Sequence, residues 1–425
     1  MTVDVPARER QADTLLRSHR GFRLLFASDA TSRTGSQVTL VALPLIAVLV
    51  LNASAQQVGL LVAASTTAFL VVALPAGIWV DRLPRRPVMM AADLIRALAL
   101  VSVPVTAAFG ALSLAQLYLV ALVIGFGDVF FDVAQQSYVS HLLGKDRLLA
   151  GFSKLEVAGS GSLLAGPPAG GVLVQLVTAP GAMAFNAACH LASAGLLGRI
   201  RPREPVVRRL GERPRLRREI TTGVRYVIGQ PILRRVAVHG MIALLFEYAL
   251  LTVQPLLLVG TLGLGPAVYG LVTGAVAVGG VVGSVFANRV VSKLGLARTL
   301  WLPFVVTFPL LLVMPLVGGG WLVALYPLGY AAYIGGSAIQ NVAQITYRQA
   351  VCPPELHGRM NSAMRFLMWG MMPVGGLLGG FLVGVVGDRN ALWVCVVGML
   401  ASLLPMLGRS VLRLPRDAGI DQGRP

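Results

Sequence analysis

Long apolar stretches separated by short polar segments follow one another along the whole chain. Most are as long as the roughly 20 residues that a helix needs to cross a bilayer. In lipid such a stretch has to be helical, because a helix satisfies its backbone polar groups within one segment. The pattern therefore predicts an all-α integral membrane protein with 12 transmembrane helices, at 22–50, 55–80, 88–108, 112–137, 150–176, 181–200, 232–259, 266–290, 298–317, 320–345, 359–386 and 390–412.

The composition of the 425-residue chain supports this prediction. Apolar residues make up 56% and charged residues 13%, about half the charged share of a soluble domain. This excludes a disordered chain, a coiled coil and an ordinary soluble enzyme. A formal net charge of +18 would point to nucleic acid in a soluble protein, so the positions of the charges decide its meaning.

The basic residues are concentrated in the segments that lie on one side of the membrane if the chain has 12 spans. They lie in the N-terminal tail, in the loop after every second span and at the C-terminus, whereas the opposite loops hold a single one, Arg389. By the positive-inside rule both termini and the central loop are cytoplasmic in a multi-pass protein of the cell membrane. The net charge then reports topology and attraction to the lipid bilayer, and no nucleic-acid partner is expected.

Several other classes of site lack a sequence signal. The first 20 residues are polar and the first apolar stretch is of full span length, so no cleavable signal peptide is expected. The three cysteines, Cys189, Cys352 and Cys395, show neither a disulfide framework nor metal-ligand spacing. No nucleotide-binding G-x-x-x-x-G-K-[ST] run is found, and neither a metal nor a cofactor is expected.

An internal repeat appears when the chain is shifted by about 209 residues. Gln135-Gln-Ser-Tyr138 then meets Gln344-Ile-Thr-Tyr347, and Gly170-Gly171 meets Gly379-Gly380. The two halves therefore read as duplicated six-helix units, with a substrate site expected at their interface. The predicted segments are a cytoplasmic tail, a six-helix half, a basic linker, a second six-helix half and a second tail, at 1–21, 22–200, 201–222, 223–412 and 413–425.

Two motifs and this repeat resemble features of the major facilitator superfamily. Gly77-Ile-Trp-Val-Asp81-Arg82-Leu-Pro84-Arg85-Arg86 resembles the loop signature of that superfamily, and Gly166-Pro167-Pro-Ala-Gly170-Gly171 resembles its antiporter signature. With Phe131-Asp132 after span four, the chain is similar to the efflux subfamily of enterobactin and macrolide exporters. The resemblance implies the major facilitator fold, two pseudo-symmetric halves and alternating access.

The same resemblance suggests roles for the motif residues. A cytoplasmic gate is expected from Gly77, Asp81, Arg82, Arg85, Arg86 and Asp132, although these arginines would also be explained by topology alone. The small residues Gly166, Pro167, Gly170 and Gly171 are expected to bend span five and let it pack closely against a partner helix.

Ionisable residues inside spans are costly and are functional candidates. Asp29 and Arg33 lie four apart in span one, and Asp93 and Arg96 lie three apart in span three. Each pair would lie on one helical face, so it is either a structural ion pair or a site for protons or substrate. His190 in span six and His239 in span seven could titrate near neutral pH, although a lone histidine is more often structural.

Glu247 lies near the middle of span seven and is the only acid inside a span of the second half. No basic residue lies at that depth in the sequence. It is therefore a candidate for binding a proton or a cationic substrate, and the alternative is a glutamate that stays protonated or solvated.

The leading hypothesis is a secondary transporter that exports a small, largely apolar molecule by proton-coupled alternating access and functions as a monomer. Such a substrate is a drug, a siderophore or a secondary metabolite, and uptake or facilitated transport is an alternative. A membrane acyltransferase is a remote alternative, since His141 and Asp146 have H-x-x-x-x-D spacing. No filter-like segment favours an ion channel.

Overall fold

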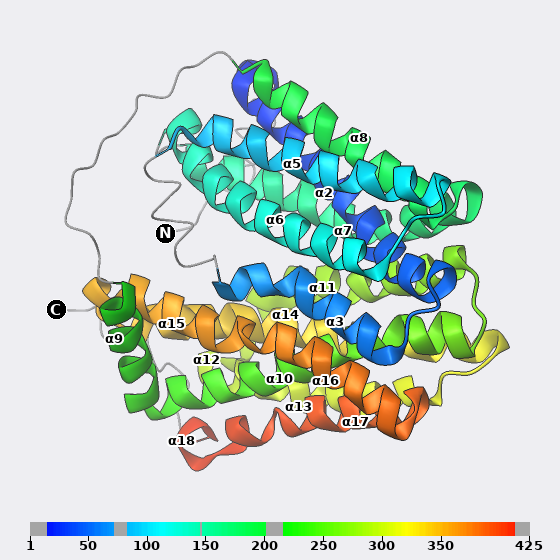
Figure 1. Ribbon diagram of the computed structural model, residues 1–425. Coiled ribbons are helices and arrows are strands. Elements are labelled where there is room, and N and C mark those ends of the chain that lie inside the picture. The colour runs from blue at the N-terminus through cyan, green and yellow to red at the C-terminus, as the bar shows by residue number, and fades with distance from the viewer. Residues whose placement is uncertain (1–14, 72–82, 145–146, 201–215, 413–425) are drawn as a thin grey trace. The chain divides into compact units, whose positions relative to one another are not determined.

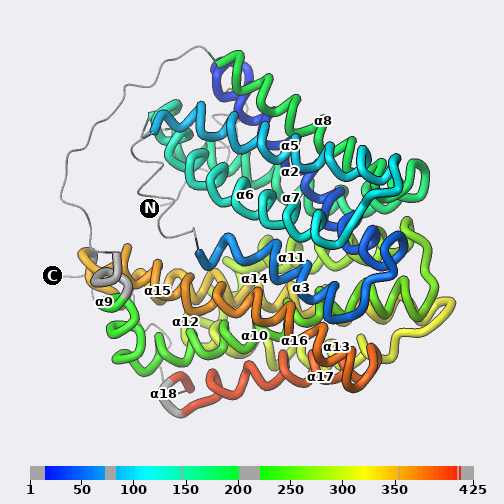
Figure 2. The backbone as a smooth tube through the Cα atoms, in the orientation of Figure 1, coloured from blue at the N-terminus to red at the C-terminus, as the bar shows by residue number. Residues whose placement is uncertain are grey.

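The computed structural model describes residues 15–71, 83–144, 147–200 and 216–412. These residues form helices without any strand. The chain divides into two compact units, one of Met1–Leu51 and Val71–Glu212 and the other of Asn52–Leu70 and Arg213–Pro425. Within each unit the long helices lie side by side with roughly aligned axes (Figures 1 and 2).

Unit 1 is built from five long helices. The first continues into a short π-helical segment at its end. Their bounds are α2 Arg20–Leu45 with η1 Ile46–Val50, α5 Arg85–Ala108, α6 Leu114–Leu143, α7 Leu148–Val177 and α8 Ala179–Gly198.

Unit 2 contains the remaining helices, including one from early in the chain. These are α3 Ala55–Val71, α9 Leu216–Gly229, α10 Pro231–Pro255 with η3 Leu256–Thr261, α11 Pro266–Leu294, α12 Leu296–Thr299, α13 Leu302–Leu311, η4 Met314–Leu316, η5 Gly320–Ala324, α14 Leu325–Val351, η6 Pro354–Leu356, α15 His357–Trp369, α16 Met371–Val386, α17 Asp388–Ala401, η7 Leu404–Leu407 and α18 Arg409–Leu412.

The helices coincide with the predicted spans. Among the described residues, ten helical segments are long and apolar enough to cross a membrane, and each matches one predicted stretch. The other two stretches correspond to α3, which is apolar and followed by residues outside the described part, and to α8. The all-helical membrane architecture is confirmed, and the count of 12 spans stays a prediction that rests on α3 and α8.

Capping side chains mark where several helices begin. The His19 Nδ1 accepts a hydrogen bond from the backbone N–H of Phe22 at the start of α2. Ser113 accepts from the N–H of Gln116 at the start of α6, and Thr178 from that of Gly181 at the start of α8. These contacts satisfy backbone donors that have no partner inside the helix.

The packing inside the two units follows the sequence repeat. In unit 1, α2 packs on both α7 and α8, and α5 packs on α6; in unit 2, α10 packs on both α16 and α17, and α13 packs on α14. Spans one and seven also share a local feature, because each has a proline, Pro44 or Pro255, followed by a π-helical segment. The two halves thus have corresponding internal arrangements.

The helix α3 is the exception to this correspondence. The predicted first half, 22–200, included it, but the compact unit that contains α3 is unit 2. A Cβ atom on Gly59 would lie 2.6 Å from the Gly376 carbonyl oxygen and 3.1 Å from the Gly380 Cα atom of α16. Figure 1 shows α3 beside α16. The compact units and the repeat units therefore differ by one helix.

Glycines on two faces of α16 explain how it packs between two helices. Gly376 and Gly380 face α3, while Cβ atoms on Gly375 and Gly379 would lie 2.3 and 2.4 Å from carbonyl oxygens of Leu245 and Ala249 in α10. Any larger side chain would force these helices apart. Small residues let membrane helices approach to backbone contact, so the glycine-rich run is a packing device.

Candidate transport site

The first predicted ion pair is present on α2. The Arg33 Nε donates to both carboxylate oxygens of Asp29, at 2.8 and 2.9 Å. The Gln135 Nε2 of α6 donates to Asp29 Oδ1 at 2.6 Å. Asp29 is fully buried, whereas the Arg33 side chain is 41% exposed and lies within electrostatic range of Asp132 and Glu156.

The second predicted ion pair, on α5, belongs to a larger group. The Arg96 Nη2 lies 2.6 Å from Asp93 Oδ1, and its Nη1 pairs with Asp128 of α6. The guanidinium also lies 4.9 Å from the centre of the Phe131 ring. A Cβ atom on Gly127 would lie 2.6 Å from Arg96 Cγ, so glycine at this position leaves room for the arginine stem. One guanidinium therefore serves two carboxylates.

The buried Asp93 carboxylate also binds two side chains of α8. The His190 Nδ1 lies 3.0 Å from Asp93 Oδ1, and the Ser193 hydroxyl donates to Oδ2 at 2.6 Å. Two α2 hydroxyls complete the group, since Ser28 Oγ lies 2.7 Å from Ser193 Oγ and Ser32 Oγ 3.3 Å from His190 Nδ1. We call Asp93, Arg96, Asp128, His190 and Ser193 the unit 1 polar network.

The sequence did not predict that the two ion pairs are contacted by side chains of other helices. These side chains are Asp128, Gln135, His190 and Ser193. A signal was available on α8, where Asn186, His190 and Ser193 recur at helical spacing on an otherwise apolar span. The Asn186 Nδ2 donates to Thr39 Oγ1 of α2 at 2.5 Å, and all three side chains are buried. A polar face that is buried inside a membrane helix predicts polar partners on its neighbours.

Glu247 lies near the middle of the span formed by α10 and η3 and is only partly exposed. It takes part in no hydrogen bond or ion pair with any residue that the structure describes. The Tyr330 and Tyr333 side chains of α14, and the neighbouring Tyr248, lie within electrostatic range of it. The surroundings are therefore aromatic, and a role of Glu247 in binding a proton or a substrate stays a prediction.

His239, about two helical turns before Glu247 on α10, has a structural contact. Its Nδ1 lies 2.7 Å from the Ser402 carbonyl oxygen, and its ring lies 4.9 Å from that of Phe304. Since the carbonyl is an acceptor, Nδ1 carries the proton. His239 therefore holds α10 against the end of α17.

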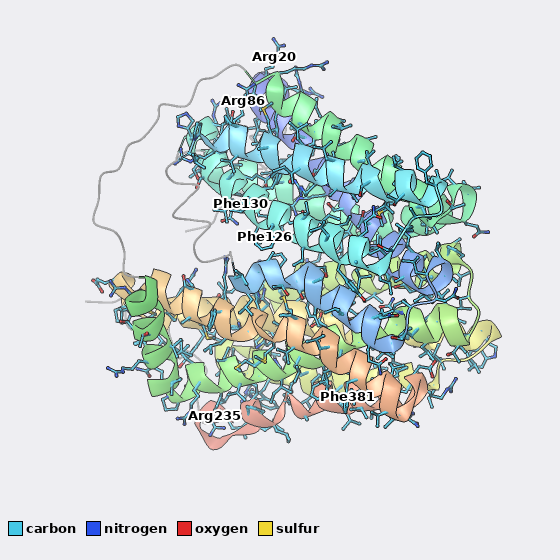
Figure 3. The ribbon with its side chains drawn as sticks, viewed as in Figure 1. Arg20, Arg86, Phe126, Phe130, Arg235 and Phe381 are labelled. Carbon is cyan, nitrogen blue, oxygen red and sulfur yellow. The ribbon has the colours of Figure 1, made fainter. Side chains whose placement is uncertain are left out.

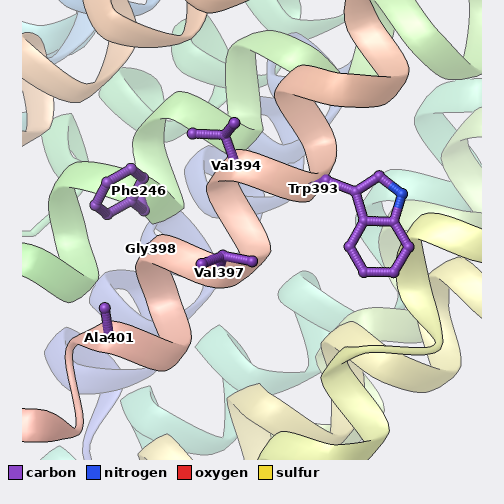
Figure 4. Close-up of a pocket in the computed structure, with 6 residues that line it drawn as sticks. All are labelled: Phe246, Trp393, Val394, Val397, Gly398 and Ala401. Atoms are coloured by element: carbon purple, nitrogen blue, oxygen red, sulfur yellow. The ribbon is translucent and has the colours of Figure 1, made fainter.

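A hollow of about 360 Å³ lies between α10 and α17 (Figure 4). It is lined by Phe246, Trp393, Val394, Val397, Gly398 and Ala401. The lining offers no charged group, and Val397 is 54% exposed. Glu247 follows Phe246 but points about 100° away around the helix, so the hollow is not a site for that carboxylate.

The predicted cytoplasmic gate is described only in part. Gly77, Asp81 and Arg82 lie outside the described residues, as does Asp146 of the acyltransferase alternative. Arg86 donates from Nε to the Leu197 carbonyl oxygen at 2.7 Å and from Nη2 to that of Gly198. It thereby caps the C-terminal end of α8 within unit 1, where a positive charge is favourable; Figure 3 shows Arg86 and Arg20 at the same end of this unit.

The remaining gate residues, Arg85 and Asp132, lie on different helices of unit 1. Arg85 is half-buried at the start of α5, and Asp132 is exposed on α6. The negative charge of Asp132 lies close enough to Arg33 to interact electrostatically with its guanidinium group. A latch role for these residues remains a prediction.

The antiporter-like segment packs within unit 1. A Cβ atom on Gly166 would lie 2.3 Å from Gln37 Cβ, and one on Gly170 would lie 3.1 Å from Val38 Cα. Both neighbours belong to α2. Pro167 lies inside α7, and Gly171 is buried on it. The described partner of this segment is thus the first span, and these residues bring α7 and α2 into close contact.

Known proteins resemble the chain over nearly its whole length. The family model described as transmembrane secretion effector matches residues 16–421. The multidrug efflux pump Tap of Mycolicibacterium fortuitum is 28% identical, covering 94% of this chain and 96% of Tap. The enterobactin exporter EntS of Salmonella typhi is 25% identical over 88% of this chain and 87% of that protein.

Solved structures agree on the fold. A bacterial homologue of the iron transporter ferroportin, in its inward-facing state, superimposes with a TM-score of 0.74 at 15% identity, covering 91% of this chain and 97% of that one. The nucleoside transporter NupG gives a TM-score of 0.71 at 11% identity, with 93% of this chain and 100% of that one covered. At these identities the likeness concerns the fold alone.

The helical membrane architecture, the corresponding packing of the two halves and the match over residues 16–421 lead to one assignment. The protein is a multi-pass membrane transporter and not an enzyme, and it belongs to the transmembrane secretion effector family of the major facilitator superfamily.

Proposed function

We propose that the protein exports a small, largely apolar molecule from the cell by alternating access, driven by inward movement of protons. The observation that carries this proposal is Glu247. It is an acid near the middle of a span, beside aromatic side chains and without a hydrogen-bond or ion-pair partner among the described residues. An intramembrane ionisable group of this kind is a functional site by default.

The relatives support the proposed direction of transport. The proteins that resemble this chain over most of its length are named as an efflux pump and as a siderophore exporter. Export against a gradient needs an energy source, and the sequence contains no nucleotide-binding G-x-x-x-x-G-K-[ST] run. A proton that is released from Glu247 when the substrate binds would supply directionality.

The surroundings of Glu247 support the proposed substrate class. The aromatic rings of Tyr330 and Tyr333 offer apolar area, with hydroxyl groups as polar anchors. Binding sites for small molecules typically combine an apolar lining with a few polar groups of this kind. A drug, a siderophore or a secondary metabolite with apolar surface fits such a lining.

The proposal is tested with the fluorescent dyes ethidium and Hoechst 33342 in cells with and without the protein. We expect several-fold lower dye accumulation in cells that express it, and loss of that difference when an uncoupler collapses the proton gradient. Higher accumulation in expressing cells would support uptake instead. Export that is insensitive to the uncoupler would exclude proton coupling.

The role of Glu247 is tested with Glu247→Gln, which keeps the size of the side chain and removes its charge. We expect at least a tenfold loss of dye export and loss of its dependence on external pH. Glu355→Gln is the matched control, because Glu355 is exposed outside the long spans and should leave export unchanged. Dye export by Glu247→Gln that still depends on pH would exclude this residue as the proton carrier.

A further inference from the structure

We propose that His190 Nε2 is a proton-binding site of the transport cycle, located in the unit 1 polar network. The inference deepens the proposed proton coupling and rests on it. It concerns a histidine in unit 1, whereas the proposed function was argued from Glu247 in unit 2.

The contacts of Asp93 determine which ring nitrogen of His190 carries no proton. The Asp93 carboxylate is ionised, because Arg96 pairs with it at 2.6 Å, and an ionised carboxylate only accepts hydrogen bonds. The His190 Nδ1, 3.0 Å from Asp93 Oδ1, therefore carries the ring proton. In the neutral imidazole the other nitrogen, Nε2, is then an unprotonated acceptor.

The Nε2 atom of His190 is the acceptor in the network that has no donor. It is buried and has no hydrogen-bond partner among the described residues. Both oxygens of Asp93 are already occupied, Oδ1 by Arg96 and His190 and Oδ2 by Ser193. Asp128 is held by Arg96. An incoming proton can therefore join the network at Nε2 without displacing an existing donor.

The charges of the network favour that proton. Asp93 and Asp128 carry two negative charges, and Arg96 carries one positive charge, so the group has a net charge of −1 when His190 is neutral. Asp93 and His190 are fully buried and Arg96 is 2% exposed, while water reaches the group only at Asp128, whose side chain is 33% exposed. An uncompensated charge is expensive in such surroundings. One proton from water, bound at Nε2, turns the imidazole into imidazolium and brings the group to neutrality.

Other charged groups near α8 do not supply this compensation. The helices packed against α8 are α2, α5 and α7. On α2, Arg20 and Arg23 are exposed in the first turn, and the pair of Asp29 and Arg33 neutralises itself. On α5, Arg85 and Arg86 lie at the end of the helix, and Arg86 caps the end of α8. On α7, Lys154 and Glu156 carry opposite charges. The deficit of one positive charge therefore stays with the unit 1 polar network.

The burial of His190 connects proton binding to movement. His190 has no exposed surface, while at the other end of the network the Asp128 side chain is 33% exposed. Exchange of a proton at Nε2 with water therefore requires α8 to separate from α2 or α5. Alternating access provides such a rearrangement, which would let His190 take up the proton in one state and release it in the other.

The direct test is NMR of the full-length protein, labelled with ¹⁵N-histidine and held in nanodiscs, between pH 5 and pH 9. The chain has five histidines, and the His190 signals are assigned by their loss in His190→Gln. Should that variant fail to fold, the signals are assigned by elimination with glutamine variants of His19, His141, His239 and His357. We expect Nε2 to be unprotonated at high pH and to become protonated as the pH falls. An Nε2 whose protonation does not change across this range would overturn the proposal.

A functional readout separates this inference from the proposed function. We expect His190→Gln to lose the pH dependence of ethidium export while exchanging dye down its gradient at the wild-type rate. His239→Gln is the matched control, because His239 is also buried in a span but binds the Ser402 carbonyl. It should keep the wild-type pH profile. A wild-type profile in His190→Gln would overturn the role of His190, whereas absence of any dye export by the wild-type protein would contradict the proposed function and leave the NMR result valid.

Discussion

Arg96 is the bulkiest of the fully buried side chains among the described residues. Its guanidinium is held by Asp93, Asp128 and the face of Phe131. Arg33 has a comparable intrahelical partner in Asp29, but its side chain is 41% exposed. The two arginines therefore form similar pairs in different surroundings, and burial decides how much each contributes to stability.

Removal of the buried arginine should be strongly destabilising. Arg96→Met leaves Asp93 without its main counter-charge, and breaking a buried ion pair costs about 3 to 5 kcal/mol. Arg33→Met should cost less, because water reaches the Arg33 side chain and the buried Asp29 keeps its hydrogen bond from Gln135. We expect thermal unfolding in detergent to show a Tm several degrees lower for Arg96→Met than for Arg33→Met. Equal shifts would show that the unit 1 polar network contributes no more than the pair of Asp29 and Arg33 on α2.

At the scale of helices, glycine sets how closely neighbours approach. A Cβ atom on Gly279 of α11 would lie 1.9 Å from the Ala331 carbonyl oxygen of α14, and one on Gly283 would lie 2.3 Å from that of Gly335. A Cβ atom on Gly195 of α8 would meet nothing within 4 Å. The same residue type thus has a packing role on α11 that it lacks at this position of α8.

Gly279→Ala should therefore separate α11 from α14. Overpacking of this kind typically costs about 1 to 3 kcal/mol, so we expect a lower Tm and less correctly folded protein on size-exclusion chromatography in detergent. Gly195→Ala is the control and should be neutral or slightly stabilising, because alanine favours a helix. A Tm for Gly279→Ala at or above that of Gly195→Ala would contradict close packing at this contact.

The elements could be predicted well, because the period and length of apolar runs report helices in lipid directly. The stretch 266–290, for example, became α11 Pro266–Leu294. The helix α9 was not predicted, since it is too polar to read as a span and begins inside the expected basic linker, 201–222. Intrahelical pairs such as Asp29 with Arg33 followed from spacing alone. The contacts of His190 with Asp93 did not, because 97 residues separate them.

At the scale of the whole molecule, the distribution of basic residues predicts orientation. Arg147 and Arg389 are both exposed and described, and the positive-inside rule places them on opposite sides of the membrane. The three native cysteines are buried, so a single introduced cysteine can be labelled selectively.

We expect Arg389→Cys to react with a membrane-impermeant maleimide on intact cells, and Arg147→Cys to react only after the cells are opened. The physical reason is the accumulation of positive charge on the cytoplasmic side during insertion. The wild-type protein is the control and should remain unlabelled under both conditions. Labelling of Arg147→Cys on intact cells would reverse the predicted topology of both termini.

The sequence by itself determined the membrane class, the spans, the repeat and the local ion pairs. These depend on hydrophobicity and on spacing within one helix, which the order of residues contains. The tertiary structure decided which polar groups of different helices meet, namely Asp128 and His190 at the two ends of one buried pair. It also placed α3 in the compact unit of the second half. Such contacts depend on how helices pack across the bilayer, where small residues permit close approach and buried polar groups have to find partners on neighbouring helices.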